Sequence, residues 1–352
     1  MCGHLVVAQS GRNILPAACH IRVAAAGDEP QKGARMDTVS KQASNVAKEA
    51  RSRKLLSVIL TFVLATTLMI PQVAWAEEEG DGGPGTATNV AKIGDKEYAT
   101  LNEAINDVPA GDPQSAPSEA TTITLLKDTN AGFDVGNSNG NAPKNIVIDL
   151  AGNTLTLGPA VGSTGTETNG IRVLAYSACE VRNGTVVCSD IQNDQGGYVK
   201  MGMANYGTLS LVDVQMKSGD YVQYTINNRG ALTLKGSTTV EDGKAAPYVA
   251  VTNDPYDYFY TDVDASLSVE GSNVKVGKVL IERYGNNQNK GASINLNIAG
   301  GVFGEVAEDG NSVVPVVGNI SGGSFSNDVS KYVAEGFSCT LVDGAYVVGE
   351  TP

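Results

Sequence analysis

Short runs of alternating apolar and polar residues follow one another between Thr121 and Phe325, separated by Gly, Asn and Asp. This period of two is typical of β-strands that bury one face. The clearest runs are TTITLL (121–126), NIVIDL (145–150), NTLTL (153–157), GIRVL (170–174), TLSLV (208–212), ALTLK (231–235), SLSVE (266–270) and SINLNI (293–298). We therefore predict an all-β region over 121–325.

The strand runs also repeat. NYGTLSL (205–211) returns as NRGALTL (228–234), and IAGGVF (298–303) returns as ISGGSF (320–325). DASLSV (264–269) and GASINL (291–296) align as looser copies. Short repeated strands with Gly and Asn corners predict a parallel β-helix, a solenoid whose coils stack about 4.8 Å apart. At about 23 residues per coil this region would form about nine coils. Two antiparallel β-sandwiches are the alternative.

Both ends of the strand region have candidate covers. Residues 91–120 begin with a predicted hairpin that turns at Gly94-Asp95. A short helix follows, with Thr100 and Glu103 as its capping box and an apolar face that ends at Val108. We expect this helix to cap the N-terminal end of the strand stack and residues 326–352 to form the C-terminal cap and tail.

Residues 51–76 have the pattern of a signal peptide. The basic residues Arg51, Arg53 and Lys54 precede an uncharged run over 55–70, and Ala74 and Ala76 form the small-x-small cleavage pattern. The apolar run is shorter than the roughly 20 residues of a membrane span. We predict cleavage after Ala76 and export to the cell surface or medium, with an uncleaved membrane anchor as the alternative.

The flanks of this leader carry less information. Met36 would start a leader of more usual length, so residues 1–35 are interpreted as an upstream start-site artefact. Residues 77–90, EEEGDGGPGTATNV, are predicted to form a disordered linker.

The charge and the histidine count exclude several function classes. The chain carries a net charge of −13. Residues 1–76 hold 9 of the 25 basic and 4 of the 38 acidic residues, which leaves 16 basic and 34 acidic residues, a net charge of −18. Such a surface argues against nucleic-acid binding. Cleavage also removes both histidines, His4 and His20, and so excludes His-dependent triads and His-based zinc sites.

Three cysteines follow the leader, Cys179, Cys188 and Cys339. If Asn183-Gly184 were a two-residue hairpin turn, Cys179 and Cys188 would face each other closely enough for a disulfide. If Asn183-Gly184 is a corner between successive strands, they would not meet. The repeats favour the corner. The odd number leaves at least one thiol outside any disulfide within the chain.

Several segments resemble a known family. GDKEYA followed by TLNEAIND, then TITLLKD, IVIDLAGNTLTL and EVRNGTVV, resembles the start of right-handed parallel β-helix proteins of the pectate-lyase-like type. The closest likeness is to secreted or wall-attached proteins of Gram-positive bacteria. GGSFSND followed by YVAEGFSCTLVDGAYVV resembles the way such repeats end. The resemblance covers residues 91–348 and implies a fold that carries lyases, hydrolases, adhesins and spacers alike.

The candidate ligand site is the segment NDPYDYFYTDVD (253–264). The step from Leu232 to Leu267 is longer than the usual repeat of about 23 residues, so this segment is predicted to leave the strand stack as a loop. The candidate ligand-binding residues are Asp254, Tyr256, Asp257, Tyr258, Tyr260, Asp262 and Asp264. Tyrosine rings stack on sugars and carboxylates bind calcium. No other cofactor is indicated, and no metal ligand is assigned.

A second polar turn contains Glu282, Arg283 and Tyr284. We expect these residues to be solvated, with Arg283 as a lyase-type base the alternative. No stretch matches the calcium cluster and basic residue of the family lyases, so no catalytic residue is assigned.

The sequence therefore predicts a secreted or cell-surface, adhesin-like β-helix that binds a glycan or a surface protein without catalysis. The alternatives are a polysaccharide lyase or hydrolase that acts on acidic glycans, and a structural spacer.

Overall fold

A computed structural model describes residues 89–352 except 138–139, 163–167, 189–198, 242–247, 253–263, 284–292 and 310–313, and for residues 248–252 it describes the backbone. The chain divides into two units, Met1–Gly83 and Pro84–Pro352, and all described residues belong to the second. The predicted leader with its cleavage residues Ala74 and Ala76, and residues 77–88 of the predicted linker, lie outside the described residues.

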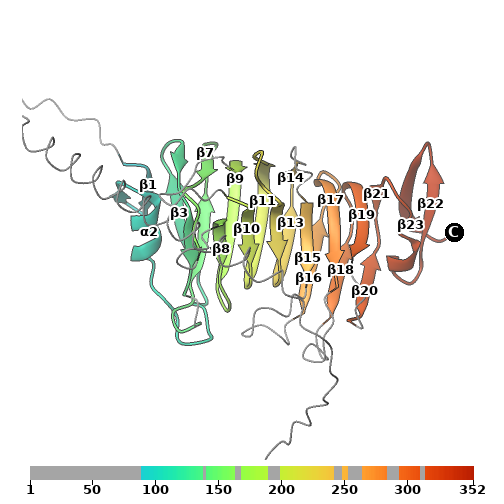
Figure 1. Ribbon diagram of the computed structural model, residues 1–352, viewed down its shortest axis with the longest axis horizontal. Helices are drawn as coiled ribbons and strands as arrows, with labels where there is room; N and C mark the ends of the chain where they lie inside the picture. The colour runs from blue at the N-terminus through green and yellow to red at the C-terminus, as the bar shows by residue number, and fades with distance from the viewer. Residues whose placement is uncertain are drawn as a thin grey trace, which may run out of the picture. The chain divides into compact units, whose positions relative to one another are not determined.

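The second unit is mostly β, and three ladders of parallel strand pairs dominate it (Figure 1). The first ladder carries most of the predicted strands. It consists of β3 (Thr121–Leu125), β6 (Asn145–Asp149), the first halves of β9 (Ala178–Cys188) and β11 (Thr208–Lys217), β13 (Ala231–Lys235), β16 (Ala265–Glu270), β18 (Ile294–Ile298) and β20 (Val316–Ile320).

The second ladder contains the strands that follow these along the chain. Its members are β4 (Thr129–Asn130), β7 (Thr154–Leu157), the second halves of β9 and β11, β14 (Thr239–Val240), the first halves of β17 (Lys275–Glu282) and β19 (Val302–Asp309), and β21 (Gly323–Phe325).

The third ladder contains the strands that come last in each repeat. We call one run of the chain through the first, second and third ladders a passage. It is formed by β5 (Phe133–Val135), β8 (Asn169–Val173), β10 (Met201–Asn205), β12 (Tyr224–Asn228), β15 (Tyr248–Thr252) and the second halves of β17 and β19. In the complete passages the chain visits the first, second and third ladders in this order, and the next passage pairs with the one before it.

Aligned apolar rows fill the core between the ladders. In the first ladder Leu209, Leu232, Leu267 and Leu296 are successive register partners, and all four are fully buried. The alternate positions Ser210, Thr233, Ser268 and Asn297 form the opposite row. Stacked identical side chains bury apolar area at every step, which stabilises parallel pairing.

The repeat spacings are confirmed where the copies are close. Leu209 pairs with Leu232, and Phe303 pairs with Phe325. The pairs are parallel, whereas the sandwich alternative requires antiparallel strands. The first ladder has eight strands among the described residues, not the nine predicted, because several passages are longer than the spacing of these close copies.

One predicted alignment is wrong by two residues. The looser copies align Ala265 with Ala292, whereas Ala265 pairs with Ile294. A shift of two residues keeps the same side chains facing the core. The alternation of apolar and polar residues is therefore compatible with both registers.

Asn183 lies at a corner within β9 and does not form a hairpin turn. Its φ is 59°, and the residues before and after it belong to the first and second ladders. Asp213 and Gly271 have φ of 56° and 115° at the corresponding corners. Cys179 and Cys188 are both buried thiols, so the disulfide expected from a hairpin is absent.

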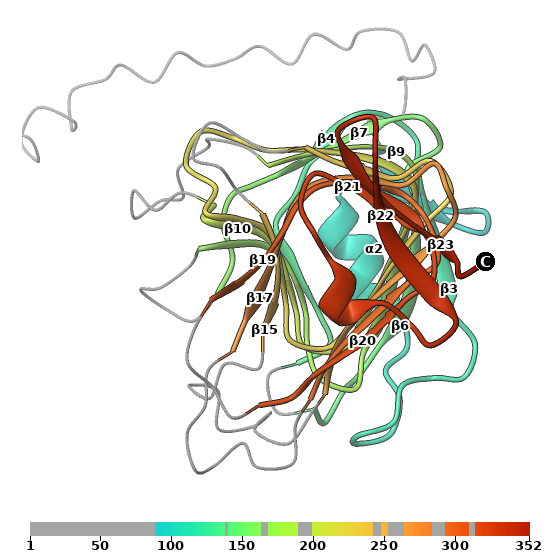
Figure 2. The ribbon, with the colours of Figure 1, turned by 90° about the vertical axis from the view of Figure 1, so that its right-hand side faces the viewer.

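Different devices cover the two ends. At the N-terminal end, β1 (Ala91–Ile93) pairs antiparallel with β2 (Lys96–Tyr98) and with β3. Helix α2 (Leu101–Asp107) begins with the predicted capping box of Thr100 and Glu103. Figure 2, which looks along the strand stack, shows α2 over the interior that the ladders surround, and its apolar face is buried.

At the C-terminal end, the short 3-10 helix η1 (Ser330–Tyr332) precedes the hairpin β22 (Phe337–Val342) and β23 (Ala345–Glu350). Strand β23 pairs antiparallel with β21, the last strand of the second ladder. Val333 forms an isolated β-bridge with Ile320, which belongs to the last strand of the first ladder. The chain after Phe325 thus pairs with the last strands of the first and second ladders.

Candidate functional site

An open cavity of about 400 Å³ lies at the turns that join the third ladder to the first. We call it the tyrosine groove, because Tyr176 and Tyr206 line it together with Thr208 and Asp264. Tyr176 follows β8 and Tyr206 follows β10, so the two rings come from successive passages of the chain.

Backbone hydrogen bonds between passages set the height of each turn. The Tyr206 N–H donates to the Val173 carbonyl at 2.8 Å, and the Arg229 N–H donates to the Asn205 carbonyl at 2.8 Å. Arg229 therefore lies one step above Tyr206. Its guanidinium carbon is 5.2 Å from the centre of the Tyr206 ring, a cation–π contact that orients the ring.

Two buried asparagines fix the same turns from inside. Asn205 and Asn228 have no exposed surface, and the Asn205 Nδ2 donates to the Asn228 Oδ1 at 2.7 Å. Each Oδ1 also accepts from a turn N–H, that of Gly207 at 3.1 Å and that of Gly230 at 3.3 Å. The asparagines thus specify the backbone that carries the groove.

Glycines leave the floor of the groove open. A Cβ on Gly230 would lie 2.2 Å from the Gly207 carbonyl oxygen, and one on Gly207 would lie 2.3 Å from the Ser177 carbonyl oxygen. Successive turns therefore touch through their backbones, a distance that only glycine allows. Peptide groups in place of side chains form this surface.

Tyr176 is the most accessible aromatic ring of the groove. The residue is 51% exposed, and its φ is 63°, which is uncommon for a bulky residue. One side of the ring lies against Gly140, where a Cβ would come within 2.9 Å of the Tyr176 Cδ2, and about half of the residue remains accessible. An exposed aromatic residue held in this way is a candidate contact for a ligand.

Of the seven predicted ligand-binding residues, the structure describes Asp264. Its Oδ1 accepts from the Ser293 N–H at 2.6 Å, and the residue is exposed beside the two tyrosines. The other six, Asp254, Tyr256, Asp257, Tyr258, Tyr260 and Asp262, lie outside the described residues. Tyr176 and Tyr206 are not among the predicted residues, because the Asn-Tyr-Gly and Asn-Arg-Gly repeat indicates the fold and does not by itself mark Tyr206 as a ligand contact.

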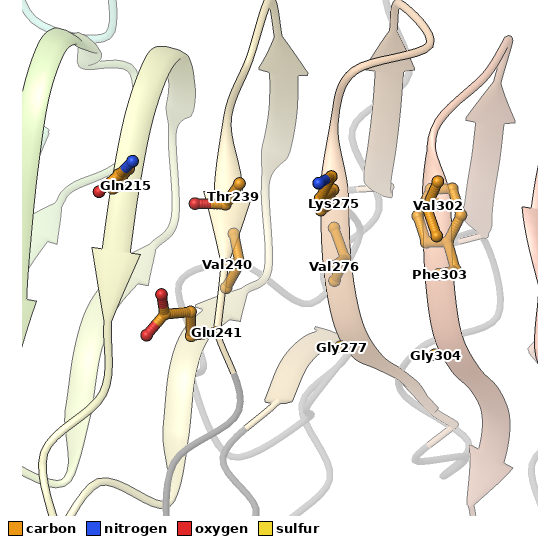
Figure 3. A pocket seen from close by; sticks show the side chains of 10 residues that line it. All are labelled: Gln215, Thr239, Val240, Glu241, Lys275, Val276, Gly277, Val302, Phe303 and Gly304. Atoms are coloured by element: carbon orange, nitrogen blue, oxygen red, sulfur yellow. The ribbon is translucent and has the colours of Figure 1, made fainter.

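A second open cavity, of about 490 Å³, lies on the outward face of the second ladder (Figure 3). We call it the glycine groove, after Gly277 and Gly304 on its floor. Its charged side chains are Glu241 and Lys275, and the Glu241 carboxylate points away from Lys275. Its other side chains are Gln215, Thr239, Val302 and the buried residues Val240, Val276 and Phe303. It presents no exposed aromatic ring.

Glu282, the last residue of β17, and Arg283 are not the solvated turn residues of the prediction, because both are held by other side chains. Glu282 is 4% exposed and accepts from the Tyr224 hydroxyl at 3.2 Å. Arg283 forms an ion pair with Glu308 at 3.1 Å and donates to the Val314 carbonyl. Tyr284 lies outside the described residues.

Glu308 is held by three donors. Burial raises its pKa, but hydrogen bonds from Tyr332, Lys331 and Arg283 outweigh burial and lower the pKa to about 2. Arg283 is thus committed to a structural cluster, which removes it as a candidate base.

Within the described ranges, no three Asp, Glu, His or Cys side chains lie close enough together to hold a metal ion. In the same part of the chain, no helix has the length and apolar content needed to cross a membrane. No family model matches the chain, and no curated protein or solved structure matches it.

Proposed function

We propose that this protein is a secreted or cell-surface right-handed parallel β-helix that binds glycans through the tyrosine groove. The three parallel ladders, the positive-φ corners and the covered ends support the β-helix. Right-handed crossovers between parallel strands are the rule, which supports the hand. The signal-peptide pattern of residues 51–76 supports export.

The observation that carries the binding function is the pairing of Tyr176 and Tyr206 in one open groove. Aromatic faces pack on the C–H faces of sugars. The Asp264 carboxylate accepts hydrogen bonds from hydroxyls at the rim, and the open turns at Gly207 and Gly230 let a flat ring approach the backbone. The acidic net charge favours neutral glycans over uronates.

A glycan array followed by titration calorimetry with the best ligand tests this proposal. Tyr176→Ala and Tyr206→Ala each weaken binding about tenfold, as expected for the loss of one stacking contact. Tyr221→Ala is the matched control, because Tyr221 is 50% exposed and does not line the groove. Full binding by the Tyr176→Ala/Tyr206→Ala double variant, or an array without a ligand, contradicts the proposal.

A polysaccharide lyase or hydrolase is the second candidate, because Glu241 and Lys275 both line the glycine groove; this role requires the Glu241 side chain to rotate, since its carboxylate points away from Lys275. A carboxylate and an amine can act as acid and base without histidine. Release of unsaturated or reducing ends from uronate polymers, lost in Glu241→Gln and in Lys275→Ala, would establish this candidate. No product with calcium present would exclude it.

A further inference from the structure

Strand β22 presents an unpaired edge at the C-terminal end of the strand stack. Its one partner among the described strands is β23, and Figure 1 shows it as the outermost strand at that end. An unpaired edge offers a row of N–H and C=O groups to another strand.

The backbone hydrogen bonds of the hairpin show which groups point outward. The Thr351 N–H donates to the Gly336 carbonyl at 2.9 Å, so these residues form a hydrogen-bonded pair. Such pairs alternate along an antiparallel ladder. Ser338 and Thr340 therefore bond to β23, whereas Cys339 and Leu341 direct their N–H and C=O groups away from it. Phe337 faces the same side as Cys339 and Leu341. Its N–H already donates to the Ala334 carbonyl, so Phe337 offers only its C=O to another strand.

This edge lacks the features that keep strands from associating. The strand FSCTLV has no charged residue and no proline, and Leu341 and Val342 are 60% and 48% exposed. The edge strand at the other end, β2, carries Lys96 and Glu97, and Lys96 forms an ion pair with Asp107 at 2.9 Å. Charges protect natural edge strands, so the N-terminal end is protected and the C-terminal end is not.

We propose that the β22 edge binds the β22 edge of a second copy of this chain, antiparallel and about a two-fold axis at Cys339. In this register, each Cys339 N–H donates to the carbonyl of Cys339 of the partner subunit. Each Leu341 N–H donates to the carbonyl of Phe337 of the partner subunit. The exposed Leu341 side chain then packs beside that phenylalanine.

The chemistry of the strand favours a second copy as the occupant. An acidic chain of net charge −13 repels its copies, and β22 itself adds no charge to that repulsion, although the Asp328 carboxylate accepts a hydrogen bond from the Cys339 side chain. The outward groups at Phe337, Cys339 and Leu341 are spaced symmetrically about Cys339, so the edge is complementary to itself, as a two-fold interface requires.

Sedimentation equilibrium of the full chain tests the proposal. The wild type is expected to dimerise, and salt strengthens the dimer by screening the acidic charge. Cys339→Pro removes an outward N–H and leaves the bonds to β23 in place, and Leu341→Lys places a charge at the contact. Each raises the dissociation constant at least about tenfold. Val347→Lys is the control, because Val347 is exposed but lies on β23, away from the edge.

Hydrogen exchange of the wild type provides an independent readout. The peptide that contains 337–342 becomes more protected as protein concentration rises, whereas one that contains 345–350 changes less. A monomer at about 100 µM overturns the proposal. A dimer that forms equally well in the Cys339→Pro and Leu341→Lys variants also overturns it. The proposal fails as well if the chain stays monomeric and its β22 edge instead binds a strand of a different protein.

Discussion

Asn205 donates from Nδ2 to the Oδ1 of Asn228, in the next passage of the chain, at 2.7 Å, and neither side chain has exposed surface. The pair joins the two passages inside the turn that carries Tyr206. Each amide also bonds the backbone of the passage above, at Ala231 and at Ser266. A buried amide network of this kind is stabilising only while every group has its partner.

Asn205→Ala should therefore destabilise the fold by about 2–3 kcal/mol, because it leaves the Asn228 Oδ1 and the Gly207 N–H with fewer partners in a buried site. Urea unfolding followed by circular dichroism measures the change. The matched control is Asn297→Ala, since Asn297 and Asn319 form the same kind of bond at 3.2 Å on the surface. Its expected change is within about 0.5 kcal/mol. Equal losses in the two variants would refute the role given to the buried pair.

The Glu308 cluster makes the stability depend on pH in a defined direction. The folded-state pKa of Glu308 is lowered to about 2, so this carboxylate contributes stability above its ordinary pKa and loses it as pH falls toward 2. The unfolding free energy of the wild type should exceed that of Glu308→Gln most above about pH 5, and the difference should shrink toward pH 2. A pH-independent difference between the two proteins argues against the cluster.

Cys179 and Cys188 should resist alkylation in the folded protein. Burial, and to a smaller degree Glu180, raise the pKa of the Cys179 thiol to about 12, so little thiolate forms at pH 8. Both cysteines should react with iodoacetamide in denaturant without a reductant, because both are thiols. They lie near opposite ends of β9 and are not joined by a disulfide. Peptide mapping measures this. A linked peptide containing Cys179 and Cys188 would restore the hairpin interpretation.

The sequence predicted the first ladder well, because its strands bury one face and expose the other. Strands β13 and β16 alternate in this way, with Leu232 and Leu267 buried and Thr233 and Ser268 partly exposed. The third ladder was mostly missed. In β10, Gly202, Met203, Ala204 and Asn205 are all buried, so the period of two disappears. A strand that buries both faces cannot be recognised from alternation.

The groove could not be found from local patterns for a different reason. Tyr176 and Tyr206 belong to different passages of the chain, and only the register between β8 and β10 brings them to one surface. The partner of Arg283 is equally remote in the sequence, because Glu308 lies on the following strand of the ladder, β19. The stacking of whole passages sets the register. The alternation of apolar and polar residues alone fits both the predicted register and the observed one, which differ by two residues in the looser copies.

Distances between spin labels on the outward row of the first ladder test the parallel stacking most directly. The row runs through Thr122, Val147, Glu180, Ser210, Thr233, Ser268, Asn297 and Asn319. Labels are placed in pairs on a chain whose Cys2, Cys19 and Cys339 are replaced by serine.

The distance from Thr122 should be about 19 Å to Thr233, about 29 Å to Asn297 and about 34 Å to Asn319 at about 4.8 Å per passage. The increments should follow the number of passages and ignore the number of intervening residues. Distances that scale with residue number, or that shorten and lengthen alternately as in antiparallel layers, would contradict the stacked passages on which the groove depends.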